Sequence, residues 1–374
     1  MSTILYVLLA ILLLGILIAI HELGHYTTAR LTGIPVREFA IGMGPKLWSR
    51  TSKKTGIIYS LRAIPMGGFC AFFGEDDPDN NVHNDPRALS NQKLWKRMLM
   101  TLMGPMMNFV LAFVVLLLFY WIGGIDAAQP GTAYQPAVSS VVTNGRADAS
   151  GIRAGDSIAE INGVSTSITQ EDAMNAAFDR DSAVFSSRIN GWKEGDAPLV
   201  FTVRRGDETL HLEVEPAYDD AAGKNMIGIT YTYNALEVQH IGLTFGQSAA
   251  LSWDQFKYYS TAIFDAVIGL FRGENLDQVA GPIGTVSIIS QEVRDNGFEA
   301  FIGLLALISV NLGIMNLLPI PGLDGSRIVF MIIEAIRRKP IPPEKEAIVH
   351  LVGFVLIFGL MIFISIRDIG NLFR

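Results

Sequence analysis

Cysteine is nearly absent from this chain: Cys70 is the only one among 374 residues. An internal disulfide and a metal site built on several cysteines are therefore both excluded. Positive charge is also scarce, since 29 Lys and Arg stand against 36 Asp and Glu, which gives a formal net charge of −7. The chain lacks the basic excess that is typical of nucleic-acid binding, so we expect no nucleic-acid partner.

Charged residues of either sign make up only 17% of the chain, whereas half of it is hydrophobic. That balance is too apolar for an ordinary soluble enzyme and indicates a multi-span α-helical membrane protein with a soluble portion. Four segments are long enough to cross a bilayer as helices, namely about residues 3–25, 98–122, 300–318 and 347–366. A signal peptide at residues 1–20 fits poorly, because no basic residue precedes the apolar run and no small-x-small cleavage site follows it.

A fifth apolar segment, about residues 249–271, is interrupted by Asp254, Lys257 and Asp265. Its apolar residues are interspersed with polar ones, which predicts an amphipathic helix on the membrane surface. This helix would belong to a connector over residues 245–296, and a genuine membrane span is the alternative.

The first apolar segment ends in His21-Glu22-Leu23-Gly24-His25. On a helix, His21 and His25 share one face because they are four residues apart. Two neutral imidazoles in that arrangement can hold a zinc ion, and Glu22 can act as general base toward a water molecule. Ionisable residues at membrane depth are costly and usually functional. The alternative is that the span ends at Ile20 and the motif is merely hydrated at the interface.

Basic residues in the connecting loops predict the orientation of the chain. Lys and Arg are concentrated between the first two spans, from Arg30 to Arg97, and between the last two, from Arg327 to Lys345. Both loops are therefore expected in the cytoplasm, with residues 123–299 and both termini outside. The histidine motif then lies toward the cytoplasmic side of the bilayer.

The outside segment contains a compact α+β insert over about residues 135–233. Its strand signals are alternating runs, and a Gly-containing turn predicts a hairpin between the last two: 138–142, 199–204 and 209–214, with the turn at 205–207. A helix is expected at 170–178, with Thr169 as its N-cap.

A stretch of this insert, residues 149–164, resembles the part of PDZ domains in which a Gly-Asp turn leads into a strand that ends in Asn-Gly. PDZ domains bind peptide ends by strand addition. The alternatives are a stabilising turn without a ligand, or a domain that acts as a steric filter.

A hydrolytic zinc usually has three protein ligands, so a third ligand must come from elsewhere in the chain. Asp324 is the candidate, at the end of the third span, where Pro319 and Pro321 break the helix. Broken backbone at membrane depth is tolerated where it lines a cavity. Asp324 could instead be a solvated cap or turn residue. Its combination with the two histidines of the first span favours a ligand.

Four motifs together resemble the bacterial site-2 proteases of regulated intramembrane proteolysis, of the sigma-E regulator protease type with one PDZ domain. They are the histidine motif, residues 316–325 (Asn-Leu-Leu-Pro-Ile-Pro-Gly-Leu-Asp-Gly), 281–284 (Gly-Pro-Ile-Gly) and 64–68 (Ile-Pro-Met-Gly-Gly). The resemblance covers nearly the whole chain. It implies an intramembrane zinc metalloprotease in which His21, His25 and Asp324 hold Zn²⁺ and Glu22 is the catalytic base.

The resemblance also implies substrates and a location. The substrates would be transmembrane proteins or peptides, such as anti-sigma factors already trimmed by an upstream site-1 protease, or signal-peptide remnants. The chain would lie in the bacterial inner membrane as a multi-pass protein. An inactive scaffold that binds such substrates through the insert is the alternative function, and a membrane-anchored peptidase for soluble peptides is a second one.

A substrate helix must be unwound before cleavage, because its carbonyls are already hydrogen-bonded. Residues 39–45 and 57–69 predict β-strands, and an edge strand there could receive the substrate by strand addition. Ordinary cytoplasmic structure is the alternative for this segment. Asn316, Pro319 and Pro321 are the expected substrate-binding residues. Asn108, in the second span, either orients the site or stabilises the oxyanion. The alternative is that it only mediates packing between helices.

These expectations divide the chain into four parts. Residues 1–122 form the first membrane part, 135–233 the extracytoplasmic domain, 245–296 the surface helix and connector, and 297–374 the second membrane part.

Overall fold

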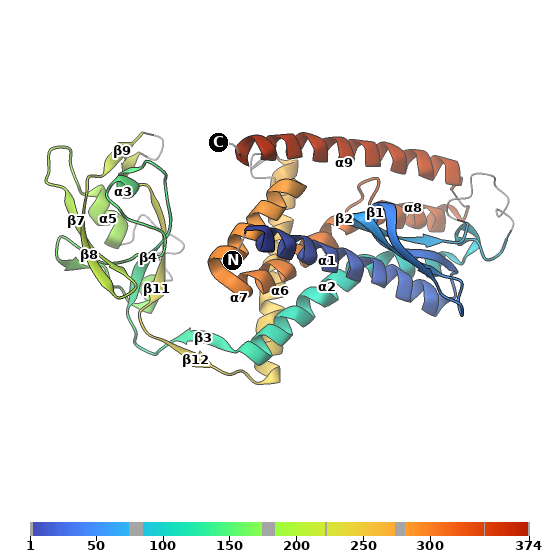
Figure 1. The fold of residues 1–374 in the computed structure, drawn as a ribbon, viewed down its shortest axis with the longest axis horizontal. Coiled ribbons are helices and arrows are strands. Elements are labelled where there is room, and N and C mark those ends of the chain that lie inside the picture. Colours follow the sequence, from blue (N-terminus) through green and yellow to red (C-terminus); the bar gives the residue numbers. More distant parts are fainter. Residues whose placement is uncertain are drawn as a thin grey trace. The chain divides into compact units, whose positions relative to one another are not determined.

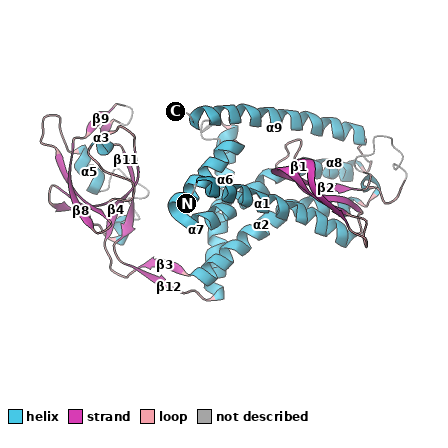
Figure 2. Ribbon diagram, in the orientation of Figure 1, coloured by secondary structure: helices cyan, strands magenta, loops and turns pink. Residues whose placement is uncertain are grey.

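A computed structural model describes residues 3–74, 85–173, 184–220, 223–273, 281–339 and 341–372. The chain forms two compact units (Figure 1). The first unit combines residues 1–123 with 243–374, and the second unit comprises residues 124–242. Figure 2 shows that the first unit is mainly helical and that strands predominate in the second.

The first unit contains four helices that are long and apolar enough to cross a membrane, within the described residues. They are α1 (Thr3–Thr32), α2 (Leu94–Gly123), α7 (Pro282–Leu317) and α9 (Pro343–Leu372). Each overlaps one of the four predicted spans, so the prediction of a multi-span membrane protein is confirmed. The helices extend beyond the predicted spans because their polar ends continue the same hydrogen-bonding pattern.

The third of these helices, α7, is broken at Gly297, where φ is 70° and ψ is −147°. A residue with a side chain rarely adopts this backbone conformation. Both halves of α7 nevertheless pack against the same stretch of α1. The shared apolar core contains Ala10, Leu13 and Leu17 of α1, Ile289 and Val293 before the break, and Leu305 after it.

The segment predicted as an amphipathic helix forms α6 (Phe245–Phe271), which is not among the four candidate spans of the described chain. Thr244 and Gln247 form a capping box at its start. One face of α6 packs on α2 and α7 through Ile263 and Val267. Tyr258, on the opposite face, is exposed, and the location of α6 at the membrane surface stays a prediction.

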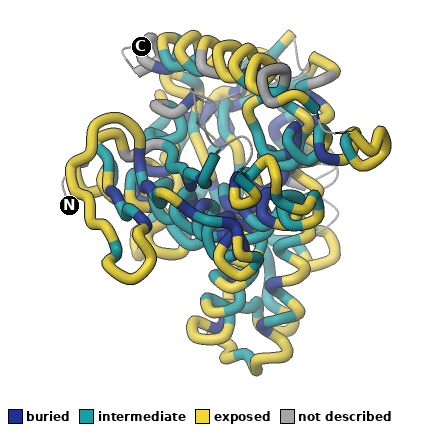
Figure 3. The backbone as a smooth tube through the Cα atoms, turned by 90° about the vertical axis from the view of Figure 1, so that its right-hand side faces the viewer, coloured by how far each residue is buried: buried dark blue, intermediate teal, exposed yellow. Residues whose placement is uncertain are grey.

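The last helix, α9, is exposed along most of its length (Figure 3). A buried carboxylate holds the C-terminal end of α9 to α7. Asp368 Oδ2 accepts hydrogen bonds from the backbone N–H groups of Gly281 (2.9 Å) and Gly284 (3.0 Å). These donors belong to the first turn of α7, where a helix leaves N–H groups unpaired and favours negative charge. The Gly-Pro-Ile-Gly motif is therefore the docking point for the C-terminal end of α9.

Two long strands follow α1, as predicted. They are β1 (Val36–Thr51) and β2 (Ile58–Phe72), which pair as an antiparallel hairpin with several bulges. The hairpin packs on α1 and α2 through an apolar cluster that contains Ala29, Val36, Cys70, Phe72 and Met100. Its association with the membrane stays a prediction. A 3₁₀ turn, Leu89–Asn91, leads into α2, and the short helix α8 (Asp324–Arg337) follows the α7 loop.

The second unit is an α+β fold around one sheet in the order β11-β4-β5-β7-β8, with β6 paired to β5. Its elements are β3 (Ile125–Ala128), β4 (Tyr134–Val141), α3 (Arg146–Ala149), β5 (Ser157–Ile161), β6 (Val164–Ser165), α5 (Val184–Asn190), β7 (Leu199–Arg205), β8 (Glu208–Val214), β9 (Ala217–Asp219), β10 (Lys224–Met226), β11 (Ile229–Ala235) and β12 (Val238–Ile241). The core is centred on Phe185 and Phe201. The three predicted strands are present as β4, β7 and β8.

The predicted helix at 170–178 lies partly outside the described residues. Its expected cap is present, since the Asp172 N–H donates to Thr169 Oγ1 at 3.2 Å. The unit is joined to the rest of the chain by a two-stranded ribbon in which β3 pairs with β12.

The predicted Gly-Asp turn of the second unit holds a buried ion pair. Asp156 accepts hydrogen bonds from Arg205 at 2.7 and 2.8 Å and from the Arg153 N–H at 2.8 Å. Arg205 also donates to the carbonyl of Gly151, so one guanidinium ties β7 to the turn before β5. Burial opposes ionisation of Asp156, but these hydrogen bonds outweigh it and lower the pKa of Asp156 below its ordinary value.

We predict that Asp156→Asn destabilises the second unit by about 2 kcal/mol at pH 7, because two charge-assisted hydrogen bonds are weakened. Because the pKa of Asp156 is lower in the folded state than in the unfolded state, its carboxylate stabilises the folded unit above the unfolded pKa of about 3.9. This stabilisation is lost as the pH falls through the folded pKa. The difference between the two proteins should therefore shrink in acid. Hydrogen exchange in β5 and β7 of the full chain measures it. Asp196→Asn, at an exposed turn, is the control, and equal protection in both variants at pH 7 would contradict the prediction.

Candidate metal centre

Helix α1 presents the three motif residues at the point where it passes the β1–β2 hairpin. His21 and His25 lie one turn apart, with ring centroids separated by 4.9 Å and Nε2 atoms by 3.2 Å. Both imidazoles thus direct the same nitrogen to one point. Glu22 is 9% exposed and lines the same cavity as the two histidines.

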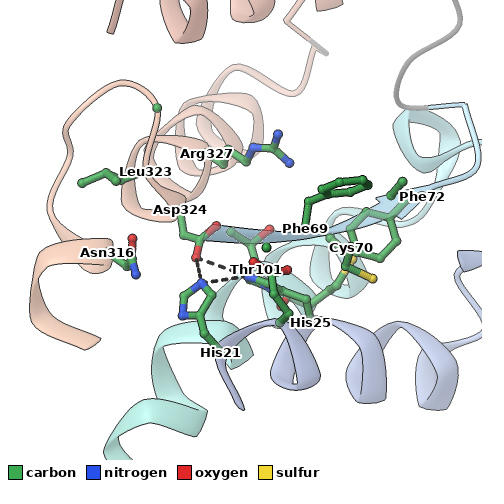
Figure 4. A pocket seen from close by; sticks show the side chains of 15 residues that line it. His21, His25, Phe69, Cys70, Phe72, Thr101, Asn316, Leu323, Asp324 and Arg327 are labelled. Carbon is green, nitrogen blue, oxygen red and sulfur yellow. Dashed lines mark hydrogen bonds and ion pairs between the residues drawn. The ribbon is translucent and has the colours of Figure 1, made fainter. Parts of the chain in front are cut away.

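Asp324 reaches this point from a distant part of the chain. It is the first residue of α8, directly after the non-helical loop that ends α7. Its Oδ2 atom lies 3.1 Å from His21 Nε2 and 3.3 Å from His25 Nε2 (Figure 4). The structure therefore brings together the three residues predicted as ligands.

The spacing of these atoms suits a zinc ion. Zinc binds His nitrogen and carboxylate oxygen at about 2.0–2.2 Å, so ligand atoms around a tetrahedral ion lie about 3.3 Å apart. The separations of 3.1, 3.2 and 3.3 Å match that value. Two imidazoles and one carboxylate are also a ligand set of hydrolytic zinc sites, which keep a fourth position open.

A backbone carbonyl orients the second histidine. His25 Nδ1 donates to the Met100 carbonyl of α2 at 2.9 Å. This contact leaves the Nε2 lone pair free for a metal, which is the usual arrangement around histidine ligands. Sequence reasoning could not find Met100, because a carbonyl carries no residue-specific signal.

Asn108 lies against the first histidine. Its side chain is fully buried, its amide nitrogen is 3.3 Å from His21 Nδ1, and its Oδ1 has no hydrogen-bond partner among the described residues. Rotation of the amide by 180° puts Oδ1 onto the Nδ1–H of His21 and leaves Nε2 free for the metal. Of the two predicted roles of Asn108, this geometry favours orientation of a ligand.

The candidate ligands open into a cavity of about 400 Å³. It is lined by residues of α1, β2, α2, α8 and the α7 loop, including Glu22, Gly68, Phe69, Thr101, Asn316, Leu323 and Arg327. Asn316 was a predicted substrate-binding residue and does face this cavity. Pro319 and Pro321, predicted with it, are not among the residues that line it. Arg327 was missed, although its place three residues after Asp324 on one helix was a usable signal.

Gly104 of α2 provides room for the two imidazoles. A methyl group at this position would overlap Nε2 of His25 and would lie 3.0 Å from Nε2 of His21. Gly104 and Asn108 are four residues apart on one face of α2, so this helix both contacts a candidate ligand through Asn108 and leaves space for the imidazoles at Gly104. The spacing was visible in the sequence, but its significance depends on which face meets α1.

We predict that Gly104→Ala removes most bound zinc from the purified protein, which should otherwise hold about one ion per chain. Alanine favours helix more than glycine does, so α2 itself should not be weakened. Metal analysis after removal of free zinc measures the loss. Gly123→Ala is the control, because that position of α2 has open space around it. Full zinc content in Gly104→Ala would show that the ion does not sit between the two imidazoles.

Comparison with known proteins identifies the family. The sequence profile of Peptidase family M50 matches residues 9–360. A protein of Nostoc sp. named "Putative zinc metalloprotease" is 34% identical over 98% of this chain and 96% of its own length. A protein of Agrobacterium fabrum with the same name is 31% identical over 98% and 96%. "Regulator of sigma-W protease RasP" of Bacillus subtilis is 30% identical over 97% of this chain and 98% of its own.

These matches cover both halves of the candidate centre and all four candidate spans. The resemblance to site-2 proteases drawn from the motifs is thereby confirmed, as is zinc as the cofactor. The chain belongs to Peptidase family M50 and is a multi-pass membrane zinc metalloprotease.

Proposed function

We propose that this metalloprotease hydrolyses peptide bonds within transmembrane segments of other proteins. The observation that carries the proposal is the origin of the three candidate ligand atoms, which lie 3.1–3.3 Å apart. Two come from α1 and the third directly follows α7, and both helices are candidate membrane spans. A site of this origin is accessible to a substrate in the bilayer.

In this proposal His21, His25 and Asp324 hold the zinc ion and Glu22 is the catalytic base. When bound, zinc polarises the scissile carbonyl and makes a water molecule more acidic. Glu22 takes the proton of the attacking water and passes it to the leaving amine. Asn108 and the Met100 carbonyl keep the two imidazoles in the orientation that binds the metal.

The substrate segment would be held extended beside β2. This strand is paired with β1 on one side, and its residues 68–72 line the cavity. Addition of the substrate as a further strand would replace the hydrogen bonds that its helix loses on unwinding. Asn316, near the end of α7, would bind the opened backbone, while Pro319 and Pro321 would shape the loop between Asn316 and Asp324.

The substrates in this proposal are membrane proteins that have already lost most of their extracytoplasmic part, such as anti-sigma factors cut by a site-1 protease, or signal-peptide remnants. The name of the Bacillus subtilis relative, a regulator of sigma-W, supports this class. The enzyme would lie in the bacterial inner membrane, with the basic loops in the cytoplasm and the zinc site toward that side.

The second unit would then lie outside the membrane as a PDZ-like domain over about residues 135–233. Its α+β fold and the Gly-Asp turn at Asp156 support this interpretation. We propose that the domain acts as a steric filter that keeps large extracytoplasmic domains from the site.

The test of the catalytic roles compares two variants. Glu22→Gln should keep zinc but cleave a transmembrane peptide at least about a hundredfold more slowly, because the general base is removed. Asp324→Ala should instead lose zinc, because a ligand is removed. Zinc content and the rate of product formation in detergent or vesicles measure both. Near-normal cleavage by Glu22→Gln would assign the base to another residue, and full zinc in Asp324→Ala would remove it from the ligand set.

The test of the filter uses the ribbon that joins the second unit. Ala128 pairs directly with Val238, so residues 130–236 can be replaced by a short turn that closes the ribbon as a hairpin. This variant should cleave substrates with long and trimmed extracytoplasmic parts at similar rates, whereas the full chain should prefer the trimmed one. If the variant still rejects the long substrate as strongly as the full chain, size selection resides in the first unit.

A further inference from the structure

The loop that leads to Asp324, residues 318–323, is held by α9. Helix α9 touches this loop at two positions that are three residues apart on one face. At the first, the Gly322 N–H donates to Nδ1 of His350 at 3.1 Å. At the second, Gly353 is buried against the loop backbone, so close that a methyl group there would overlap the carbonyl of Pro321.

The contacts of His350 define the tautomer of its neutral ring. Because Nδ1 accepts from Gly322, the neutral ring must carry its proton on Nε2. Nε2 lies 3.6 Å from Glu346 Oε1, one turn earlier on α9, and a nearby carboxylate favours a proton on this nitrogen. The ring also meets Phe330 of α8 edge to face, with centroids 5.8 Å apart. His350 thus fits between α8 and α9 with its acceptor directed at the loop.

The loop needs such an anchor because its own hydrogen bonds are few. Residues 318–323 are not helical, and Gly322 has a φ of 100° that other residues rarely adopt. Within the loop, the Ile320 N–H donates to Leu318 O and the Leu323 N–H donates to Ile320 O. The Gly322 N–H is therefore the backbone donor that fastens this turn to another element, two residues before Asp324.

We propose that His350 is a positioning residue for the metal centre: its imidazole fixes the Gly322 turn and thereby sets the place of the Asp324 carboxylate relative to the two histidines. The inference rests on the ligand set proposed above. Residues that orient ligands in this way typically change metal affinity 10–100-fold when they are removed. His350 itself touches neither the metal position nor the substrate path.

The experiment compares variants that keep or remove the acceptor. His350→Leu fills a similar volume without an acceptor and should raise the zinc dissociation constant of the full chain about tenfold, at the lower end of the effect of such residues. His350→Asn places an oxygen where Nδ1 was and should stay close to the wild type. Leu351→Ala, on the exposed face of α9, is the matched control and should change nothing. Zinc affinity is measured by competition with a chelator.

Cleavage provides an independent measurement. The zinc concentration for half-maximal cleavage should shift in His350→Leu and return in His350→Asn. Glu346→Leu removes the carboxylate beside His350 Nε2. It should shift the zinc concentration for half-maximal cleavage in the same direction, but by less. This variant keeps the test meaningful if His350→Leu does not fold.

Two results would overturn the proposal: wild-type zinc affinity in His350→Leu, or equal defects in the leucine and asparagine variants. Failure of the ligand set would look different, since zinc affinity would then be insensitive to Asp324→Ala as well. A wild-type protein that binds zinc through these residues but cleaves no transmembrane peptide would count against the proposed function and leave the role of His350 intact.

Discussion

The candidate metal centre depends on convergence: three candidate ligand atoms from two ends of the chain lie within about 3.3 Å of one another. Side chains alone cannot enforce this, because each ligand has rotatable bonds and the apolar surroundings offer few hydrogen bonds. The structure meets the requirement with backbone contacts. Met100 O fixes one imidazole, and the loop before Asp324 is held to α9. Preorganisation of this kind is what a weakly solvated site needs to bind a divalent ion.

Close backbone approach makes these contacts possible, and glycine provides it at each crossing. Gly24 of α1 faces the carbonyl of Met103, and Gly68 of β2 lies against Glu22, where a methyl group would be 3.0 Å from its Cγ. Small residues at helix crossings are typical of membrane bundles, where packing rather than hydrophobicity holds helices together. Around this centre they have a second consequence. They bring carbonyl and amide groups within hydrogen-bonding distance of polar side chains that lipid would otherwise leave unpaired.

The sequence predicted the features that depend on local pattern. Four apolar runs predicted the candidate spans, and the HExxH spacing predicted two histidines on one helical face. Asp324 could be proposed because two prolines end the preceding helix, but its approach to the histidines is a property of the bundle. Gly104 and His350 were not identified, since their roles depend on which helix faces which, whereas the position of Arg327 three residues after Asp324 was a usable signal that was missed. The break at Gly297 was also missed, although it lies in a polar stretch, Arg294-Asp295-Asn296-Gly297, in which Asn-Gly is a turn signal.

Insertion of the second unit has little free-energy cost for the folding of the first unit. The entering strand β3 follows α2 directly, and the leaving strand β12 pairs with it before the chain continues into α6. Ile125 and Ile241 are opposite each other in this ribbon, so the chain leaves and re-enters the membrane unit at one place. An insert with adjacent ends adds little loop-closure entropy to the fold that receives it. Each unit also has its own apolar core. The first unit can therefore keep the geometry of its candidate ligands independently of changes in the inserted unit.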